Sequence, residues 1–278
     1  MCQVLEVSEN GYNNWRKRGK SKRKQYDEFL AERIEDAYHH HRGHYGSPRL
    51  HVELQDQGIH CSRKRVARLM RERSLSATKK RRKVRTTNSN HSFPIASNLL
   101  EQDFTADAPN KKWVTDFTCI DTREGHFFVA GILDTYSRKI VGWSMSDHHD
   151  TEFAKAALSM ALLQRQPGAG LIHHSDRGSE YASTSYQMML SEHGIQGSMS
   201  KKGDCYDNAM IESFWATLKE ECVEEKHFSS RKEAEIAIFS YIEVYYNRVR
   251  MHSSLGYMSP VEYEKQGEQK KEQKERNA

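Results

Sequence analysis

The chain has 278 residues, a formal net charge of +5, 36% hydrophobic residues and 29% charged residues. This length allows two domains. The mean hydropathy of −0.88, the lack of any apolar run near the ~20 residues that a bilayer requires, and the lack of a signal-peptide pattern argue against membrane and secreted classes. The five cysteines include no CxxC pair, so we expect reduced thiols in a cytoplasmic protein.

The charge is unevenly distributed along the chain. Residues 1–90 hold 22 Lys and Arg against 10 Asp and Glu, whereas the remainder is mildly acidic. This asymmetry predicts an N-terminal module that binds polyanions, joined to a domain with a different function. Residues 1–26 form a helical and basic segment that includes "RKRGKSKRK" (16–24), which fits either a solvated linker or an arm that contacts phosphates.

Residues 27–78 are predicted to form a small helical domain. Helical spacing of apolar residues marks 27–43, 47–58 and the Arg-rich stretch 61–75, with Ser62 as an N-cap. This order is typical of a helix-turn-helix, and a basic three-helix bundle without base readout is the alternative. The candidate DNA contacts are Arg49, Arg63, Lys64, Arg65 and Arg68.

The histidine-rich "HHHRGH" (39–44) suggests zinc, but the only nearby cysteine, Cys61, has no partner at zinc-ligand spacing. We therefore predict no zinc site.

A basic linker, 79–105, precedes a predicted α/β domain at 106–264. Strands are expected at 112–121, 126–134, 138–146, 170–176 and 195–200, and helices at 150–164, 183–194, 206–221 and 230–248. The order predicts a mixed sheet of about five strands flanked by helices. The low-complexity tail 265–278 is expected to be disordered.

Three acids of this domain stand out by position. Asp116 lies inside the first strand, Asp176 ends the short fourth strand, and Glu212 lies on helix 206–221. Carboxylates brought together repel one another and stay ionised if divalent cations lie between them. Mg²⁺ suits such ligands, and two ions about 3.5–4 Å apart support phosphoryl displacement. Taken singly, each acid also fits a plain interpretation: a satisfied core group, a turn former or a solvated helix charge.

Helix 206–221 has two distinct faces on a helical wheel. The predicted buried stripe contains Ile211, Phe214, Leu218 and Cys222, and the row beside it contains Asn208, Glu212 and Lys219. Asp207, Glu220 and Glu221 are interpreted as ordinary terminal charges. Other candidates have structural interpretations: a turn former at Asp134, structural or capping acids at Glu180 and Asp207, and His173 and His174 as core groups that could orient Asp176.

Four stretches, "WVTDFT", "LDTYSRKIVGW", "HHSDRGSEY" and "DNAMIESFWATLKEE", resemble the DDE catalytic core of bacterial insertion-sequence transposases. More narrowly, the chain looks like the second-frame protein of the group whose transposase gene is split into two frames. "HYGSPRLHVELQDQGIHCSRKRVARLMRE" resembles that group's helix-turn-helix, and "YNRVRMHSSLGYMSPVEY" its C-terminal motif. The resemblance implies a ribonuclease H-like core, related to retroviral integrases.

The resemblance also implies roles for single residues. Asp116, Asp176 and Glu212 match the catalytic triad, which would bind two Mg²⁺ ions, with Mn²⁺ as a substitute. Lys219 matches a basic residue assigned to DNA contact near the reacting phosphate, and Asn208 and Asp134 match family positions.

The function implied is metal-dependent cleavage and strand transfer at insertion-sequence ends. The expected partners are double-stranded DNA (terminal inverted repeats and target), further copies of the chain on DNA, and a first-frame product as fusion or partner, because this chain shows no sustained heptad. A non-catalytic DNA-binding regulator with a degenerate core is the alternative from another class. A retroviral-type integrase would need the zinc pattern, and the flanking motifs argue against a resident nuclease.

Overall fold

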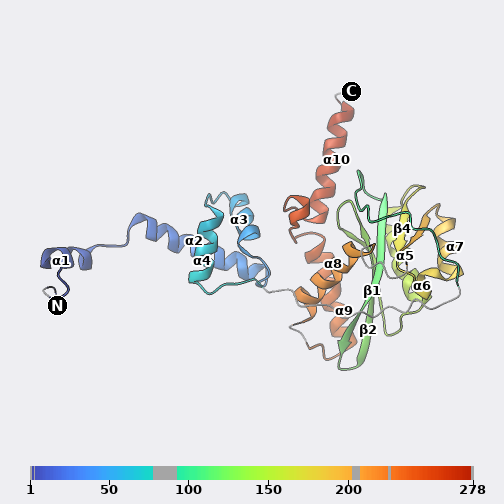
Figure 1. Cartoon of the computed structure of the whole chain (residues 1–278), viewed down its shortest axis with the longest axis horizontal. Coiled ribbons are helices and arrows are strands. Elements are labelled where there is room, and N and C mark those ends of the chain that lie inside the picture. Colours follow the sequence, from blue (N-terminus) through green and yellow to red (C-terminus); the bar gives the residue numbers. More distant parts are fainter. Residues whose placement is uncertain (1, 3, 78–92, 202–206, 225–226, 277–278) are drawn as a thin grey trace. The chain divides into compact units, whose positions relative to one another are not determined.

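The computed structural model describes every residue except 1, 3, 78–92, 202–206, 225–226 and 277–278 (Figure 1). The chain divides into two compact units, Met1–Lys79 and Lys80–Ala278. Most of the expected linker 79–105 lies at or just after this division, and its residues 79–92 lie outside the described residues.

The first unit is helical. Its described helices are α1 (Glu9–Lys17), α2 (Lys22–His40), α3 (Ser47–Asp56) and α4 (Arg63–Glu72). Helix α2 begins five residues before the predicted start because the Ser21 side chain accepts a hydrogen bond from the Lys24 amide and caps it. Ser62 caps α4 as predicted, and the N-cap residue of α3 is Gly46.

Helices α2, α3 and α4 enclose a small apolar core. The fully buried side chains of this core are Leu30, Ile34, Tyr45, Leu50, Leu54 and Val66. The fully buried residues of α2 and α3 are four apart within each helix, and α4 buries Leu69 and Met70 beside Val66, so each helix buries one stripe. Helix α1 contributes none of its side chains to this core, since it has no buried residue.

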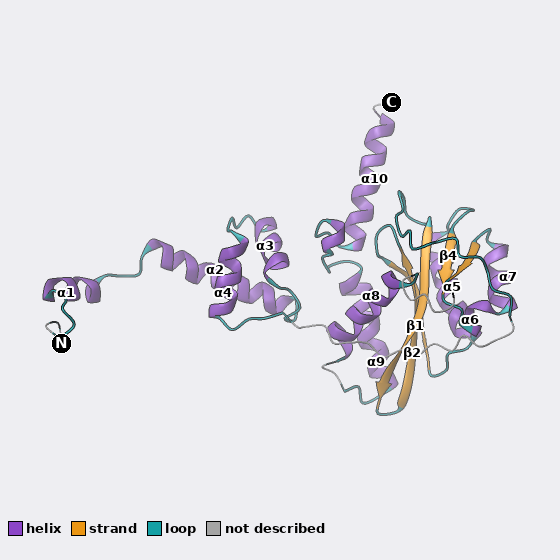
Figure 2. Cartoon of the chain, viewed as in Figure 1, coloured by secondary structure: helices purple, strands orange, loops and turns teal. Residues whose placement is uncertain are grey.

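The second unit is built on a mixed sheet, as predicted. Its strands are β1 (Lys112–Thr122), β2 (Gly125–Asp134), β3 (Ile140–Ser146), β4 (Ile172–Ser175) and β5 (Gln196–Met199), in the order β3-β2-β1-β4-β5 (Figure 2). Strands β1, β2 and β3 are antiparallel neighbours, whereas β4 runs parallel to β1 and β5 parallel to β4. The central strand β1 therefore joins the antiparallel and parallel halves.

Both faces of the sheet are covered because successive residues of a strand point to opposite faces. Trp113 and Ile132 belong to the apolar cluster formed with α5 (Thr151–Arg165), α6 (Ser179–Ala182) and α7 (Thr184–Glu192). Val114 and Leu133 belong to the cluster formed with α8 (Ala209–Leu218), η1 (Lys219–Val223), α9 (Arg231–Phe239) and η2 (Ser240–Tyr246). Helix α8 packs directly on β1 and β2.

The helices 206–221 and 230–248 were predicted as uninterrupted α-helices, and this prediction was wrong in both C-terminal halves. Each changes to π-helix, at η1 and at η2. A π turn inserts an extra residue into the helical repeat, which changes the direction of every later side chain. The amphipathic spacing of both stretches concealed this change.

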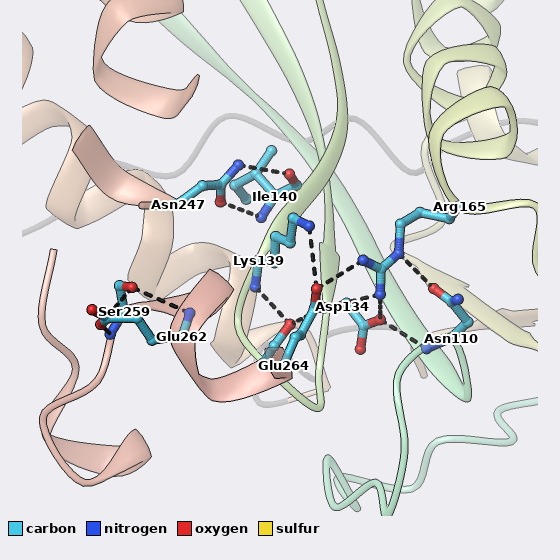
Figure 3. A network of polar contacts seen from close by, with 10 residues as sticks. Asn110, Asp134, Lys139, Ile140, Arg165, Asn247, Ser259, Glu262 and Glu264 are labelled. Atoms are coloured by element: carbon cyan, nitrogen blue, oxygen red, sulfur yellow. Dashed lines mark hydrogen bonds and ion pairs between the residues drawn. The ribbon is translucent and has the colours of Figure 1, made fainter. Parts of the chain in front are cut away.

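The C-terminal part contains η3 (Ser253–Leu255) and α10 (Pro260–Arg276). The start of α10 is held to the sheet by buried charges: Arg165 donates to Glu264 at 2.9 Å and to Asp134 at 3.3 Å, and Lys139 lies 3.2 Å from Glu264 (Figure 3). The prediction of a disordered tail was wrong for residues 265–276, which belong to α10. Glu, Gln and Lys are strong helix formers, and the anchored first turns supply the nucleus that an isolated tail lacks.

Candidate active site

Asp116 and Asp176 lie on neighbouring parallel strands. Val114 of β1 pairs with His174 of β4, so two residues further along each strand the chain reaches Asp116 and Asp176. Asp176 follows the last residue of β4, where its backbone leaves the sheet. The register thus brings the two acids together as the sequence predicts.

Glu212 reaches this place from α8. Asn208, the N-cap residue of α8, donates a hydrogen bond from Nδ2 to the Thr115 carbonyl at 3.1 Å, which holds the start of the helix beside Asp116. Glu212 lies in the first turn of α8, near the positive end of the helix dipole. The predicted stripe of Ile211, Phe214, Leu218 and Cys222 is fully buried, as expected.

The electrostatics show that the three acids converge. Burial raises the pKa of Asp116 well above its usual value, and the negative charges of Asp176 and Glu212 raise this pKa further. Such a cluster is unfavourable by itself and becomes favourable when a cation neutralises it. The donor set consists of carboxylate oxygens, which fits a hard divalent cation.

The carboxylates are not packed into one tight ligand set. Among the described residues, the group of three possible ligands whose atoms all lie within 4.8 Å of one another is Cys119, Asp121 and His126. The three acids are therefore spread more widely.

Trp215 and Tyr181 border Asp116 and were not singled out from the sequence. Gly131 is the β2 partner of Asp116, and a Cβ added to Gly131 would lie 2.9 Å from Cη2 of Trp215. The nearby Trp215 indole lowers the pKa of Asp116, against the stronger effect of burial. The charge of Asp116 also raises the pKa of Tyr181 beyond the effect of burial. The sequence feature that could have revealed this contact is the position of Trp215, three residues after Glu212 on the same predicted helix.

The turn after Asp176 is tight. The Gly178 amide donates to Asp176 Oδ1 at 2.8 Å. A Cβ on Gly178 would lie 2.7 Å from Glu180 Oε2 and 3.0 Å from Asp176 Oδ1. Glycine at this position therefore lets the backbone approach both carboxylates and orient Asp176.

Lys219 is half-buried and lies at the end of α8, where η1 begins. Its ammonium lies near enough to lower the pKa of the Cys119 thiol against the larger effects of burial and Asp121. A straight helix places it about 10.5 Å beyond Glu212 along the axis. Lys219 and the hairpin β1–β2 thus extend from the acids in the same direction.

The predicted DNA contacts of the first unit lie in three different environments. Arg63 and Lys64 are exposed on α4. Arg65 donates to Asp27 at 2.6 Å and Arg68 at 2.9 Å, so these two guanidinium groups fasten α4 to α2. Arg49 of α3 is half-buried, with its guanidinium 5.1 Å from the ring centre of Tyr45.

Asp134 is more than a turn former. It accepts the Tyr136 amide at 3.0 Å, as a turn residue would, and is also fully buried against Arg165 (Figure 3). Glu180 is structural, with His149 at 2.9 Å. Asp207 is 1% exposed and accepts from Asn98 at 2.8 Å.

The interpretation of Glu221 as an ordinary terminal charge was wrong. Its carboxylate is buried, accepts from Arg250 at 2.7 Å and accepts from the Tyr241 hydroxyl at 2.8 Å. The π turn places this residue on the buried side. For Asp207, the interpretation as a terminal charge was wrong and the interpretation as a structural acid agrees with its burial and its bond from Asn98.

His173 and His174 are both core residues. His173 Nε2 lies 2.8 Å from the Tyr186 hydroxyl, and His174 Nδ1 lies 2.9 Å from the Ser198 hydroxyl. Burial lowers the pKa of His173 to about 3 and that of His174 to about 4. Both rings are therefore neutral at physiological pH.

Comparisons with known proteins agree with this architecture. The integrase core domain family matches residues 106–205 and 193–260, and the HTH-like domain family matches residues 25–83. A 31 kDa protein of insertion element IS600 from Shigella sonnei is 48% identical over 263 residues, covering 95% of this chain and 97% of the relative. The transposase InsF for insertion sequence IS3A from Escherichia coli (strain K12) is 41% identical, covering 95% and 92%.

Among solved structures, the simian T-cell lymphotropic virus intasome in complex with a PP2A regulatory subunit has a chain with a TM-score of 0.49 and 13% identity, covering 77% of this chain and 70% of that chain. None of the described helices is both long and apolar enough to cross a bilayer.

The two relatives cover nearly the whole chain, and the family matches account for both units. The chain therefore belongs to the insertion-sequence transposases with an integrase core, metal-dependent enzymes of the DDE class that bind DNA, cleave it and transfer its strands.

Proposed function

We propose that Asp116, Asp176 and Glu212 are the catalytic residues of this transposase and hold two Mg²⁺ ions, which Mn²⁺ can replace. The observation that carries the proposal is the convergence of three carboxylates from β1, the end of β4 and α8, which raises the pKa of Asp116. Their charge needs cations for the site to be stable in its ionised form.

The bound ions would activate the attacking hydroxyl and stabilise the leaving oxygen of an in-line displacement. The attacking group is water in the cleavage step and a DNA 3′-hydroxyl in the joining step. The protein holds the three carboxylates in place through the β1–β4 register, the Gly178 amide and the Asn208 bond to β1. No covalent bond between protein and DNA is needed.

The DNA contact proposed for the second unit is Lys219, and Asn208, the other expected contact, is proposed to position the helix instead. Lys219 lies along the helix that carries Glu212, where its ammonium can hold a phosphate near the reacting group. Asn208 Nδ2 is occupied by the Thr115 carbonyl, so Asn208 acts on the site by fixing α8. Arg49, Arg63, Lys64, Arg65 and Arg68 are the contacts proposed for the first unit. The exposed pair Arg63 and Lys64 has the strongest support.

The proposed substrates are the terminal inverted repeats of the element and the target DNA. Joining two ends to one target needs two active sites, so the enzyme is proposed to act as a homo-oligomer on DNA. A first-frame product is proposed as a fusion or partner that adds end recognition. Light scattering with and without paired terminal-repeat DNA would measure the copy number, and a single copy in an active complex would contradict the proposed oligomer.

The test is cleavage of DNA that carries the element's terminal inverted repeats, with Mg²⁺ or Mn²⁺. Asp176→Asn should lower the rates of cleavage and joining by more than about 100-fold. Mutation of a residue that only hydrogen-bonds to a metal ligand already lowers metal affinity or activity about 10–100-fold. DNA binding should remain. The exposed Asp107→Asn is the matched control and should keep activity. Normal activity in Asp176→Asn would overturn the assignment, and DNA binding without metal-dependent cleavage by the unaltered chain would favour the regulator hypothesis.

A further inference from the structure

A cluster of a cysteine, an aspartate and a histidine lies on the β1–β2 hairpin, beyond the catalytic carboxylates. One ligand atom from each of Cys119, Asp121 and His126 lies within 4.8 Å of the other two. Cys119 is three residues beyond Asp116, which is about 10 Å along a strand. The cluster is therefore separate from the centre that contains Asp116.

The register of the hairpin explains why these side chains meet. Asp121 pairs directly with His126 across β1 and β2, so their side chains lie on the same face. Cys119 is two residues before Asp121 on the same strand and shares this face. The hairpin tip that carries them is itself fixed: the Arg123 amide donates to the Phe228 carbonyl at 3.0 Å, and the Arg231 amide donates to Glu124 at 2.8 Å.

We propose that Cys119, Asp121 and His126 form a binding site for a transition-metal cation of the Zn²⁺ class. Thiolate, imidazole and carboxylate are the three ligand types of protein zinc sites, and three protein ligands leave a fourth position for water. The ligand atoms need to come about 3–4 Å apart around such an ion. Their present spacing requires only side-chain rotation, which the exposed Asp121 and His126 allow.

The same three residue types also occur in nucleophilic sites, and this alternative fits less well. His126 Nδ1 does lie 2.8 Å from Asp121 Oδ1. However, burial and the charge of Asp121 raise the pKa of the Cys119 thiol, which keeps it protonated and weakly nucleophilic. A bound cation compensates the nearby negative charge and displaces the thiol proton, so it turns this arrangement into a favourable one.

Cobalt substitution tests the proposal, since Co²⁺ bound to a thiolate absorbs in the near ultraviolet through sulfur-to-metal charge transfer, and carboxylate-bound Co²⁺ does not. We expect this band on titration of the full chain, its loss in Cys119→Ser and at least tenfold weaker binding in His126→Ala. The band should remain in Asp116→Asn, which alters the catalytic carboxylates, and in Cys61→Ser, which removes another partly exposed thiol.

Thermal unfolding supplies a second measurement and checks that each variant is folded. Zn²⁺ at about 100 times its dissociation constant should raise the Tm by about 5 °C. Most of this rise should disappear in Cys119→Ser and persist in Cys61→Ser. A missing charge-transfer band, or a band that survives in Cys119→Ser, would overturn the proposal.

Discussion

Arg250 donates two parallel hydrogen bonds to the buried Glu221 carboxylate: Nη2 lies 2.7 Å from Oε1 and Nε lies 2.8 Å from Oε2. Their side chains are 7% and 5% exposed. Glu221 belongs to η1, the π turn that follows the helix of Glu212. The pair therefore joins the end of the helix that carries Glu212 to the C-terminal part of the chain.

Breaking this pair should destabilise the protein strongly. Arg250→Ala leaves a buried carboxylate without its cation, a change that costs about 3–5 kcal/mol in typical proteins. Urea denaturation would measure the loss. The exposed Arg248→Ala is the matched control and should change stability by less than about 0.5 kcal/mol. Equal effects of the two substitutions would show that the pair has no special role.

Gly131→Ala should displace α8, the helix that carries Glu212, because the added methyl group would press on Trp215. The added Cβ would lie 2.9 Å and 3.1 Å from two ring carbons of Trp215, and overpacking of this kind costs about 1–3 kcal/mol. Because Trp215 and Glu212 share α8, cleavage should fall more than tenfold while DNA binding persists. Gly168→Ala, which meets no atom within 4 Å, should leave both properties unchanged. Full activity in Gly131→Ala would contradict the close contact.

The stability of the metal-free protein should depend on Asp116 and pH. The folded-state pKa of Asp116 is raised, so the folded protein holds this proton more tightly than the unfolded chain does. Ionised Asp116 thus costs stability, and this cost is absent below the unfolded pKa of about 4 and grows as pH rises through the raised folded pKa. Asp116→Asn should raise the Tm in EDTA at pH 8, with a gain that shrinks towards pH 4.

Thermal scans of both proteins across this range would measure the effect, with Asp107→Asn as a control that removes an exposed acid. Mg²⁺ should raise the Tm of the unaltered protein more than that of Asp116→Asn. A lower Tm for Asp116→Asn at pH 8 would contradict the raised pKa.

Alanine substitutions in the two pairs of basic residues on α4, exposed Arg63 and Lys64 and ion-paired Arg65 and Arg68, should affect DNA binding and stability differently. Arg63→Ala and Lys64→Ala should weaken DNA binding and each reduce the salt slope of the binding constant by about one, because each removes one phosphate contact. Their Tm should not change. Arg65→Ala should lower the Tm as well, since Arg65 holds Asp27 of α2. Binding titrations at several salt concentrations, together with thermal scans, separate the two outcomes, and an unchanged slope in Lys64→Ala would rule out its phosphate contact.

Local patterns in the sequence were sufficient for most element positions. Short apolar runs separated by polar segments placed all five strands, and the side chains of Ser62, Asp150 and Ser230 cap the helices expected to follow them. These features depend on residues within a few positions of one another. The three acids were selected because recognisable motifs surround them, and the strand register then accounts for the meeting of Asp116 and Asp176.

Other features required the tertiary structure because they depend on how segments of the chain pack or pair with one another. The burial of Glu221 depends on Arg250, and the space for Trp215 depends on Gly131. The meeting of Cys119, Asp121 and His126 depends on the register of one hairpin, since a shift by one residue would send these side chains to opposite faces. The sequence by itself determined most of the elements and singled out Asp116, Asp176 and Glu212. The fold decided which charges are buried, since burial depends on the packing of distant segments.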